Sequence, residues 1–295
     1  MKLLPEQLSR IKIDKQLNEV GWDIVSREEY IPNHAQAIKE ALMYGTTESD
    51  YLLFIDNKAI AVIEAKREEN EFENDVAIQG KLVEQRPEEG TGEELFKLIQ
   101  KEKQQLIKKE KTLPAIEESE ITFDIPSTWK WVRLSQIVYN HGQKISNNKF
   151  SYIDIGSIDN INRRLNESEN IIEPQNAPST ARKIIFIGDI VYSTVRSYLH
   201  NIAIIDKIFS EEPIASTGFS VLSCIGGMIN KFLFRCLLSS YFDNYANKDC
   251  NAKGVMYPAI SEDKLSKALI SVPPLEEQKR IVAKIEELLP LCRGN

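Results

Sequence analysis

The sequence has few of the residue types that build metal, disulfide or redox centres. Its four cysteines, Cys224, Cys236, Cys250 and Cys292, form no CxxC pair, and its three histidines are dispersed. A zinc site or a disulfide framework needs cysteines or histidines at close, regular spacing. The cysteine pattern therefore argues against both and predicts reduced, mostly buried thiols.

Long uncharged apolar runs are also absent. A helix that crosses a bilayer needs about 20 consecutive apolar residues, so no membrane association is expected. The N-terminal segment lacks the apolar core of a secretory signal peptide, which predicts a cytoplasmic protein. A chain of 295 residues is long enough for about two domains.

Positive charge is in short supply. The chain has 37 Lys and Arg residues against 44 Asp and Glu residues, a net charge of −7. Attraction to nucleic acid by bulk charge is therefore excluded, although local basic loops are not. The acidity is concentrated before residue 121, whereas residues 134–270 are close to neutral. Any contact with nucleic acid is expected in the later half of the chain.

A β-hairpin pattern in residues 51–65 carries the first candidate site. Two short strand-like runs flank a polar turn centred on Asn57. Pairing about Asn57 would set Asp50 opposite Glu64, with Lys66 on the same face. Two carboxylates that hold Mg²⁺ beside an amine are what magnesium-assisted phosphodiester cleavage needs. This hairpin therefore predicts a candidate nuclease centre.

The same residues resemble a known catalytic pattern. Asp50 with Glu64-Ala65-Lys66 resembles the D…ExK centre of restriction-type nucleases, and residues 42–68 resemble the nuclease domain of the restriction subunit of type I restriction-modification enzymes. If active, such a centre would bind Mg²⁺ through Asp50 and Glu64. The family domain continues past its ExK with further helix and a Gln…Tyr pair, whereas an acidic stretch follows Arg67 here. Residues 1–75 are therefore predicted to be a truncated, vestigial α/β nuclease-like segment.

Helical patterns frame the rest of the chain. Residues 6–20 and 34–44 have helical spacing of apolar positions. Residues 93–111 contain no Gly or Pro and carry a narrow apolar stripe, and a second stripe of Ile281, Ile285, Leu288 and Cys292 lies near the C-terminus. We expect the two stripes to pack on each other as in a coiled coil; the alternative is a solvated surface helix. Between them we expect strands at 152–155, 183–186, 190–193 and 202–205, and a buried helix within 228–241.

Four runs in this later part resemble the specificity subunit of type I restriction-modification enzymes. They are AIQGKLVEQRPEEGTGEELFKLIQKEKQQL (77–106), FDIPSTWKWVRLSQI (123–137), IGDIVYSTVR (187–196) and SVPPLEEQ (271–278). The resemblance implies a non-enzymatic subunit that binds double-stranded DNA without a cofactor and assembles with a methyltransferase subunit. The restriction subunit and a second copy of the chain are further candidate partners.

The resemblance and the pattern of elements together predict an α+β fold. A mixed α/β target-recognition domain is expected at 117–272. It follows a long coiled-coil-like helical spacer at 76–116 and precedes a spacer helix at 273–295.

Candidate DNA contacts are Arg, Lys, Asn, Gln, Ser and Thr side chains on loops, because these groups can reach base edges in a groove. They form four clusters: Gln143, Lys144, Asn147, Asn148 and Lys149; Arg163 and Arg164; Ser193, Thr194 and Arg196; Lys253 and Tyr257. Two other hypotheses stay open. One is a nuclease that uses Asp50, Glu64 and Lys66, and the other is a helical scaffold without DNA affinity.

Overall fold

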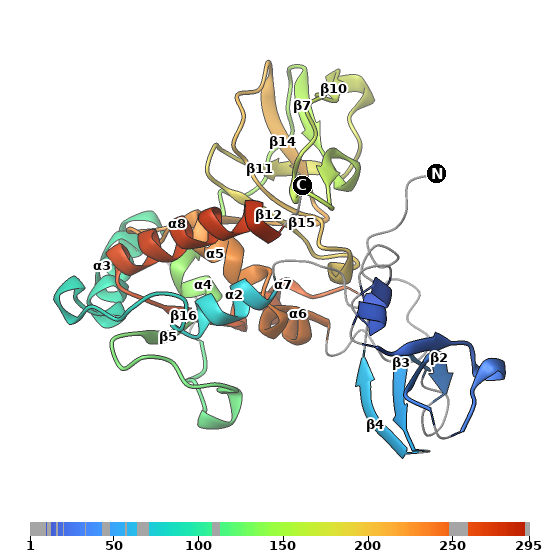
Figure 1. Cartoon of the computed structure of the whole chain (residues 1–295). Helices are drawn as coiled ribbons and strands as arrows, with labels where there is room; N and C mark the ends of the chain where they lie inside the picture. The colour runs from blue at the N-terminus through green and yellow to red at the C-terminus, as the bar shows by residue number, and fades with distance from the viewer. Residues whose placement is uncertain are drawn as a thin grey trace. The chain divides into compact units, whose positions relative to one another are not determined.

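The chain forms two compact units, residues 1–69 and 70–295, in a computed structural model (Figure 1). The structure describes residues 10, 13–15, 17–19, 21–32, 34–42, 48–56, 58–63, 71–107, 113–247 and 259–292. The predicted boundary at residue 75 lies a few residues after the division between the units. The predicted spacers at 76–116 and 273–295 are not separate bodies, because both belong to the second unit.

The first unit is a small four-stranded sheet. Its strands β1 (Asp23–Val25), β2 (Gln36–Leu42), β3 (Glu48–Ile55) and β4 (Lys58–Ile63) lie side by side in that order. The β1–β2 pair is parallel and the other two pairs are antiparallel. A short 3-10 helix, η1 (Arg27–Glu29), joins β1 to β2. The described residues between 10 and 19 are helical, as the sequence predicted for residues 6–20.

The predicted helix at 34–44 is wrong, because this segment contains the strand β2. Strand β2 lies between β1 and β3, and Ala37 and Ile38 are buried there. Pairing on both edges together with this burial outweighs the helical propensity of its Ala, Glu and Leu residues.

The predicted hairpin is confirmed, with one difference in register. Tyr51 pairs with Ile63 and Leu53 with Ala61, which is pairing about Asn57. The register shifts by one residue between Leu53 and Phe54, so Ile55 pairs with Lys58 and the turn shortens to two residues.

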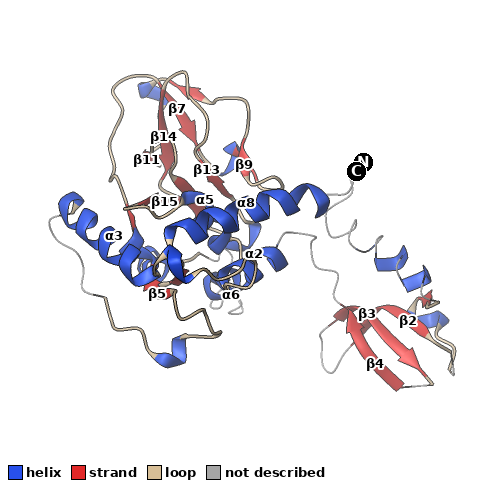
Figure 2. Ribbon diagram, turned by 60° about the vertical axis from the view of Figure 1, so that its left-hand side comes forward, coloured by secondary structure: helices blue, strands red, loops and turns tan. Residues whose placement is uncertain are grey.

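Two four-stranded sheets form one end of the second unit (Figure 2). One has the order β10-β7-β14-β11 and the other β13-β12-β15-β6. Their facing sides share an apolar core that includes Ile153, Val191, Ala203, Ala215 and Phe219. The strands are β6 (Val138–Tyr139), β7 (Phe150–Ile153), β10 (Ile171–Ile172), β11 (Ala181–Ile184), β12 (Ile190–Ser193), β13 (Ile202–Ile204), β14 (Glu212–Ser216) and β15 (Phe219–Cys224). The four predicted strands are thus confirmed within a few residues.

Short elements connect these strands. A two-stranded ribbon of β8 (Ile158–Asp159) and β9 (Arg164–Leu165) follows β7. Three short 3-10 helices complete the connections: η4 (Ile155–Ser157), η5 (Pro174–Asn176) and η6 (Ser197–Leu199).

Helices gather at the other end of the second unit, around the antiparallel pair of β5 (Lys130–Arg133) and β16 (Leu269–Val272) (Figure 2). They are α2 (Glu71–Ile78), α3 (Gly92–Leu106), α4 (Leu134–Ile137), α5 (Asn230–Leu237), α6 (Ser240–Asn247), α7 (Glu262–Lys267) and α8 (Leu275–Cys292), with η2 (Pro87–Glu89) and η3 (Glu118–Glu120) between them. Helix α5 confirms the predicted buried helix. None of the described helices is both long and apolar enough to cross a bilayer.

The structure does not confirm the predicted coiled-coil pairing of the two apolar stripes. Leu95 and Ile99 of α3 are buried in the core of their own unit, and a Cβ on Gly226 would come within 2.7 Å of the Ile99 Cα atom. Ile281 and Ile285 of α8 are fully buried in the same core, and α8 packs on α5, α2 and η2. The buried part of each stripe therefore docks its helix on the core of the unit, whereas Leu98 and Leu106 of α3 are exposed.

Both faces of β5 are covered. Val132 and Leu134 point into the main core, while Trp131 packs against Phe123 with ring centroids 4.9 Å apart. Arg133 is almost fully buried, and hydrogen bonds offset the cost of burying its charge. Its guanidinium donates two of them to the Glu120 carboxylate and one each to two backbone carbonyls.

The described cysteines are free thiols, as the sequence predicted. Cys236 is buried, and burial raises the pKa of Cys224 to about 12. Such thiols are poor nucleophiles at neutral pH. Cys250 and the side chain of Cys292 lie outside the described residues.

Candidate nucleic-acid interface

The turn between β8 and β9 holds the first pair of predicted DNA contacts. The Asp159 carboxylate accepts hydrogen bonds from the backbone N–H groups of Ile161 and Asn162 and from the Asn162 side chain at 2.7 Å. These bonds, the side-chain bond first, hold the pKa of Asp159 below its usual value. The turn continues into Arg163, which has a φ of +53°, and then into the exposed Arg164. An Asx-type turn thus carries two consecutive arginines.

The second element is the η6 loop, which we define as residues 195–200. Arg196 and His200 flank η6, and both have a φ of +50°. A left-handed conformation costs a residue other than glycine roughly 1–2 kcal/mol. Among the described residues, four that are not glycine have positive φ, and Arg163, Arg196 and His200 are three of them. Backbone strain of this kind persists where neighbouring groups fix it, often at functional sites.

Helix α6 supplies such neighbouring groups. The His200 Nε2 atom lies 2.7 Å from Asp243 Oδ1, and the Ser197 hydroxyl donates to Asn247 Oδ1 at 2.7 Å. Asn247 in turn donates to Asp243 Oδ1 at 2.8 Å. One carboxylate, Asp243, and one amide, Asn247, lie a helical turn apart on α6 and hold the two ends of η6.

The same loop also contacts the turn between β8 and β9. Asn160 donates its side-chain N–H to the Leu199 carbonyl at 3.2 Å, and Arg163 Nη2 lies 3.5 Å from His200 Nδ1. The structure thus brings together Arg163 and Arg196, which are 33 positions apart in the sequence, within one group of loops.

Ser193 and Thr194, two further predicted DNA contacts, form hydrogen bonds to the backbone in this structure. Ser193 is buried and donates to the Val195 carbonyl, and the Thr194 hydroxyl donates to the Gly218 carbonyl at 3.0 Å. Each hydroxyl donates to a backbone carbonyl, and these two bonds fix the backbone just before the η6 loop. In this structure both hydroxyls therefore serve as loop anchors, and their predicted contact with bases stays a prediction.

Lys253 and Tyr257 lie outside the described residues, within the stretch 248–258. That stretch leaves the end of α6 and leads to Ala259, which bridges to Val195 in the η6 loop. The residues on either side of it therefore belong to the same group of loops.

The cluster of residues 143–149 is at a different place. Lys144 forms an ion pair with Glu212, and Lys149 forms one with Glu211 at 2.6 Å. The hydrogen bond that Lys149 donates to Glu211 is the main reason that the pKa of Lys149 is raised. These residues lie at the start of β7 and β14, whereas the turn between β8 and β9 follows the other end of β7. Carboxylates already partner both lysines, which weakens the prediction that they meet phosphate.

The polar members of that cluster stay candidates. Gln143 forms an isolated bridge with Lys183, and Asn147 and Asn148 are exposed. Nothing in the contacts of these three residues connects them with Arg163 or Arg196.

Four residues of the loop group were missed by reasoning from the sequence: Asn160, His200, Asp243 and Asn247. The run Asp159-Asn160-Ile161-Asn162 is a turn signature that could have drawn attention to Asn160. His200 had no local signal, because its partners come from α6, 43 residues later.

A second polar cluster has the residue types of a hydrolase triad. The Ser223 hydroxyl donates to Asp189 Oδ1 at 2.6 Å, and His141 Nε2 lies 2.7 Å from that hydroxyl and 3.1 Å from Asp189 Oδ2. The Tyr139 hydroxyl meets His141 Nδ1. A triad needs its carboxylate and nucleophile on opposite ring nitrogens. Here both share one nitrogen, so the cluster joins strands and activates no nucleophile.

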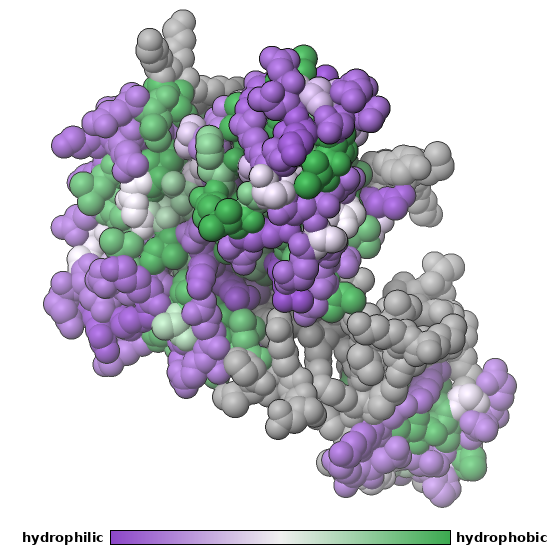
Figure 3. Space-filling view, turned by 90° about the horizontal axis from the view of Figure 1, so that it is seen from above, coloured by the Kyte–Doolittle hydropathy of each residue, from purple (hydrophilic) through white to green (hydrophobic). Residues whose placement is uncertain are grey.

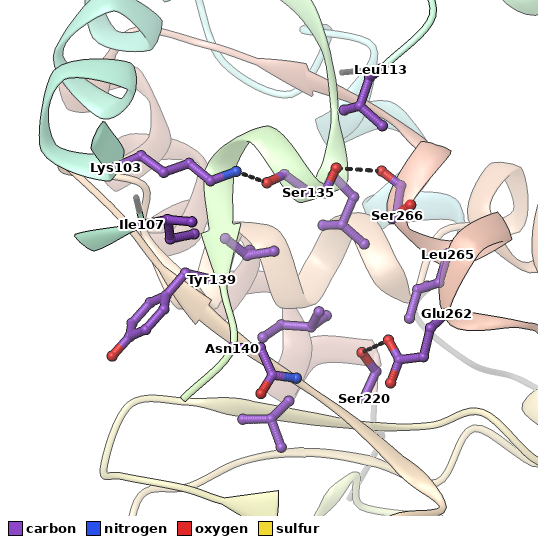
Figure 4. A pocket seen from close by; sticks show the side chains of 14 residues that line it. Lys103, Ile107, Leu113, Ser135, Tyr139, Asn140, Ser220, Glu262, Leu265 and Ser266 are labelled. Atoms are coloured by element: carbon purple, nitrogen blue, oxygen red, sulfur yellow. Dashed lines mark hydrogen bonds between the residues drawn. The ribbon is translucent and has the colours of Figure 1, made fainter. Parts of the chain in front are cut away.

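A cavity of about 270 Å³ lies between the end of α3, β6, β15 and α7 (Figure 4). Its wall is mostly apolar, and its polar groups bond to one another: Lys103 reaches the Ser135 carbonyl, and Ser220 donates to Glu262 at 3.0 Å. These satisfied contacts leave the cavity without polar groups that converge on a ligand.

The predicted nuclease centre cannot be built from the described part of the chain. Asp50 lies in β3, but Glu64 and Lys66 are outside the described residues. Among the residues that the structure does describe, no three His, Cys, Asp or Glu side chains gather as metal ligands would.

The profile of the type I restriction modification DNA specificity domain matches residues 126–291. The chain belongs to this family. The match begins at Pro126, just before β5, and ends within α8, so it covers the candidate interface and most of the helical end of the second unit.

Known specificity subunits are similar to a larger part of the chain than the family profile covers. The EcoAI specificity subunit of Escherichia coli is 29% identical over 246 residues, which cover 74% of this chain and 38% of the relative. The EcoEI specificity subunit of the same organism is 24% identical, with 74% and 39% covered. The chain therefore spans about two fifths of the length of these relatives.

A solved structure shows the same fold. The crystal structure of the HsdS subunit from Thermoanaerobacter tengcongensis superposes with a TM-score of 0.52 at 36% sequence identity, over 58% of this chain and 44% of that one. The mixed α+β fold predicted from the sequence is confirmed by this similarity. None of these matches supports the predicted nuclease-like segment.

Proposed function

We propose that this chain is the DNA-recognition subunit of a type I restriction-modification system. It binds double-stranded DNA in a sequence-specific way, without a cofactor, and directs methylation and restriction by other subunits in the cytoplasm. A methyltransferase subunit is its main protein partner, and the restriction subunit is a further one. Family membership and the names of its relatives, all specificity subunits, support this proposal.

The observation that carries the proposal is that two loops in contact with each other carry Arg163, Arg164 and Arg196 in an otherwise acidic chain. Arginine is the side chain best suited to bidentate contact with guanine in the major groove, and it also binds phosphate. The exposed Tyr198 and Ile161 on the same loops add apolar surface that can contact thymine methyl groups. Local cations on strained, anchored loops explain how a chain of net charge −7 binds DNA.

We also propose that a second copy of the chain supplies a second recognition domain when the complex forms. The chain carries one such domain and spans about two fifths of its relatives. Ile281 and Ile285 of the second stripe are buried in the core of their own unit, so Ile285→Lys is expected to unfold the domain rather than split a dimer. In the first stripe Leu98 and Leu106 are exposed. Figure 3 shows apolar residues interspersed with hydrophilic ones on one face of the second unit. We expect the pairing to be weak in the free chain and to be strengthened by DNA or methyltransferase. Light scattering with and without methyltransferase tests this; a monomer in both conditions contradicts it.

For residues 1–75 we propose a nuclease-like remnant without activity. The pairing of Tyr51 with Ile63 supports the predicted register, in which the next pair outward is Asp50 with Glu64. The sequence after Arg67 offers no clear counterpart to the rest of the family site.

Selection from a pool of random DNA duplexes tests the DNA-recognition proposal. The full chain, alone and with its methyltransferase subunit, is expected to enrich a short defined sequence. The double variant Arg163→Ala with Arg196→Ala is expected to lose that enrichment, and Lys144→Ala with Lys149→Ala is expected to keep it. Failure of the wild-type chain to enrich any sequence in either form overturns the proposal.

A further inference from the structure

We propose that Asp243 and Asn247 on α6 are positioning residues that set the η6 loop, and through it the turn between β8 and β9, in the conformation that reads DNA. This inference rests on the proposed DNA-recognition function and extends it from the arginines to the side chains that orient them. Neither residue is assigned a contact with DNA. Their role is to hold Arg196 and Arg163 in register with each other.

The η6 loop lacks enough internal hydrogen bonds to define itself. Within it, the Leu199 N–H bonds to the Arg196 carbonyl and the His200 N–H bonds to the Ser197 carbonyl, each at 2.9 Å. One turn of three residues with a left-handed residue at each end is intrinsically unfavourable, because such a residue prefers other backbone conformations. The conformation therefore depends on partners outside the loop.

Helix α6 supplies those partners at both ends of η6. Ser197, the first residue of η6, bonds to Asn247, and His200, just after its end, bonds to Asp243. The two α6 residues are also bonded to each other, through Asn247 Nδ2 and Asp243 Oδ1. Phe242 and Ala246 anchor α6 in the main core, so the η6 loop is bonded to a helix that is itself fixed by core packing.

His200 extends this control to the second loop. Its Nε2 atom meets Asp243, and its Nδ1 atom faces the Arg163 guanidinium at 3.5 Å. The side chain of His200 is largely buried, with 12% of it exposed, so its ring is confined between these two groups. A displacement of Asp243 is therefore transmitted to Arg163 as well as to Arg196.

The charge of Asp243 makes the proposal sharply testable. Removing a carboxylate near a DNA-binding surface strengthens attraction to phosphate for any DNA sequence. If Asp243 were only a surface charge, Asp243→Ala would tighten binding to every duplex. If it positions the loops, the same change weakens binding to the selected sequence while binding to a scrambled duplex stays equal or tightens. The two roles predict opposite changes for the selected sequence.

The experiment measures dissociation constants of the full chain for the duplex enriched by wild type and for a scrambled duplex of equal length. We expect Asp243→Ala to lower the ratio of the two affinities about tenfold, as for a loss of one or two well-placed hydrogen bonds. Asn247→Ala and Ser197→Ala are expected to lower it in the same direction. The conservative Asp243→Asn keeps an acceptor oxygen and is expected to restore most of the ratio.

Two controls are matched to these variants. Asn244→Ala changes an exposed residue of the same helix, and Asp124→Ala removes an exposed carboxylate elsewhere in the unit. Both are expected to keep the wild-type ratio. Thermal melts confirm that each variant is folded. If Asp243→Ala is not folded, Ser197→Ala decides, because it removes a second bond between the η6 loop and α6, the one from Ser197 to Asn247.

The outcomes separate this inference from the function on which it rests. A wild type that selects a sequence, together with folded Asp243→Ala and Ser197→Ala variants of unchanged ratio, overturns the positioning role and leaves the function standing. A wild type that selects no sequence overturns the function itself.

Discussion

The indole N–H of Trp129 donates a hydrogen bond to Glu277 Oε2 at 2.9 Å, and both side chains are nearly inaccessible to solvent. This bond joins the residue before β5 to the first turn of α8, across 148 positions of the sequence. Gln85 donates to the other carboxylate oxygen of Glu277. One buried carboxylate thus ties the start and the final helix of the specificity domain to each other and to Gln85, which precedes the domain.

Burial raises the pKa of Glu277, against the lowering effect of the bonds from Trp129 and Gln85. A carboxyl whose pKa is higher in the folded chain favours folding below its unfolded pKa of about 4.3 and loses that contribution as pH rises through the folded pKa. We therefore predict that wild type loses melting temperature relative to Glu277→Gln between pH 4 and pH 7. The prediction is contradicted if the difference in melting temperature between wild type and Glu277→Gln stays constant with pH, or if wild type gains melting temperature relative to the variant as pH rises.

Arg133 is predicted to be a main contributor to stability. Arg133→Ala removes a buried guanidinium and leaves the carbonyls of Ala115 and Lys267 and the Glu120 carboxylate without their donor. A polar group inside a protein that loses its donor typically costs about 1–3 kcal/mol, so we expect the free energy of unfolding to fall by about 3 kcal/mol. The matched control is Lys130→Ala on the same strand, whose partly exposed pair with Glu93 is expected to contribute below about 1 kcal/mol. Denaturant unfolding curves measure the free energy of unfolding of both variants. A similar decrease for Arg133→Ala and Lys130→Ala would contradict this prediction.

The chain is predicted not to cut DNA in the presence of Mg²⁺. The reason is the lack of sequence after Arg67 that completes the nuclease centre. Supercoiled plasmid incubated with purified chain and Mg²⁺ is expected to stay intact over hours. Cleavage that vanishes in Glu64→Ala would show that the centre is active, whereas cleavage that persists in that variant would indicate a contaminating nuclease.

Much of the fold could be predicted from local pattern. Strands such as Ile190–Ser193 and the hairpin about Asn57 were predictable because turn residues bound short β-branched runs. Gln36–Leu42 was not, because pairing on two edges overrides its helical composition. The sequence also did not predict what each apolar stripe packs against. A stripe indicates that a helix is docked on a surface, but it does not identify that surface.

The candidate site was predictable in its arginines and not in its geometry. Arg163 and Arg196 are recognisable as possible DNA contacts from residue type and loop position. Their meeting depends on His200 and Asp243, whose contact spans 43 positions and leaves no local pattern. Ser193 and Thr194 had the right residue types but lie where backbone carbonyls take up their hydroxyls.

The most direct test of the account is the affinity of the full chain, with its methyltransferase subunit, for the selected and the scrambled duplex across a range of salt concentrations. The few local cations predict that both affinities fall with salt along a shallow slope, corresponding to roughly three or four phosphate contacts rather than about ten. The ratio between the two duplexes is predicted to stay at about a thousandfold or more, as for specific DNA-binding proteins. A ratio near one at every salt concentration would contradict sequence-specific recognition by this chain.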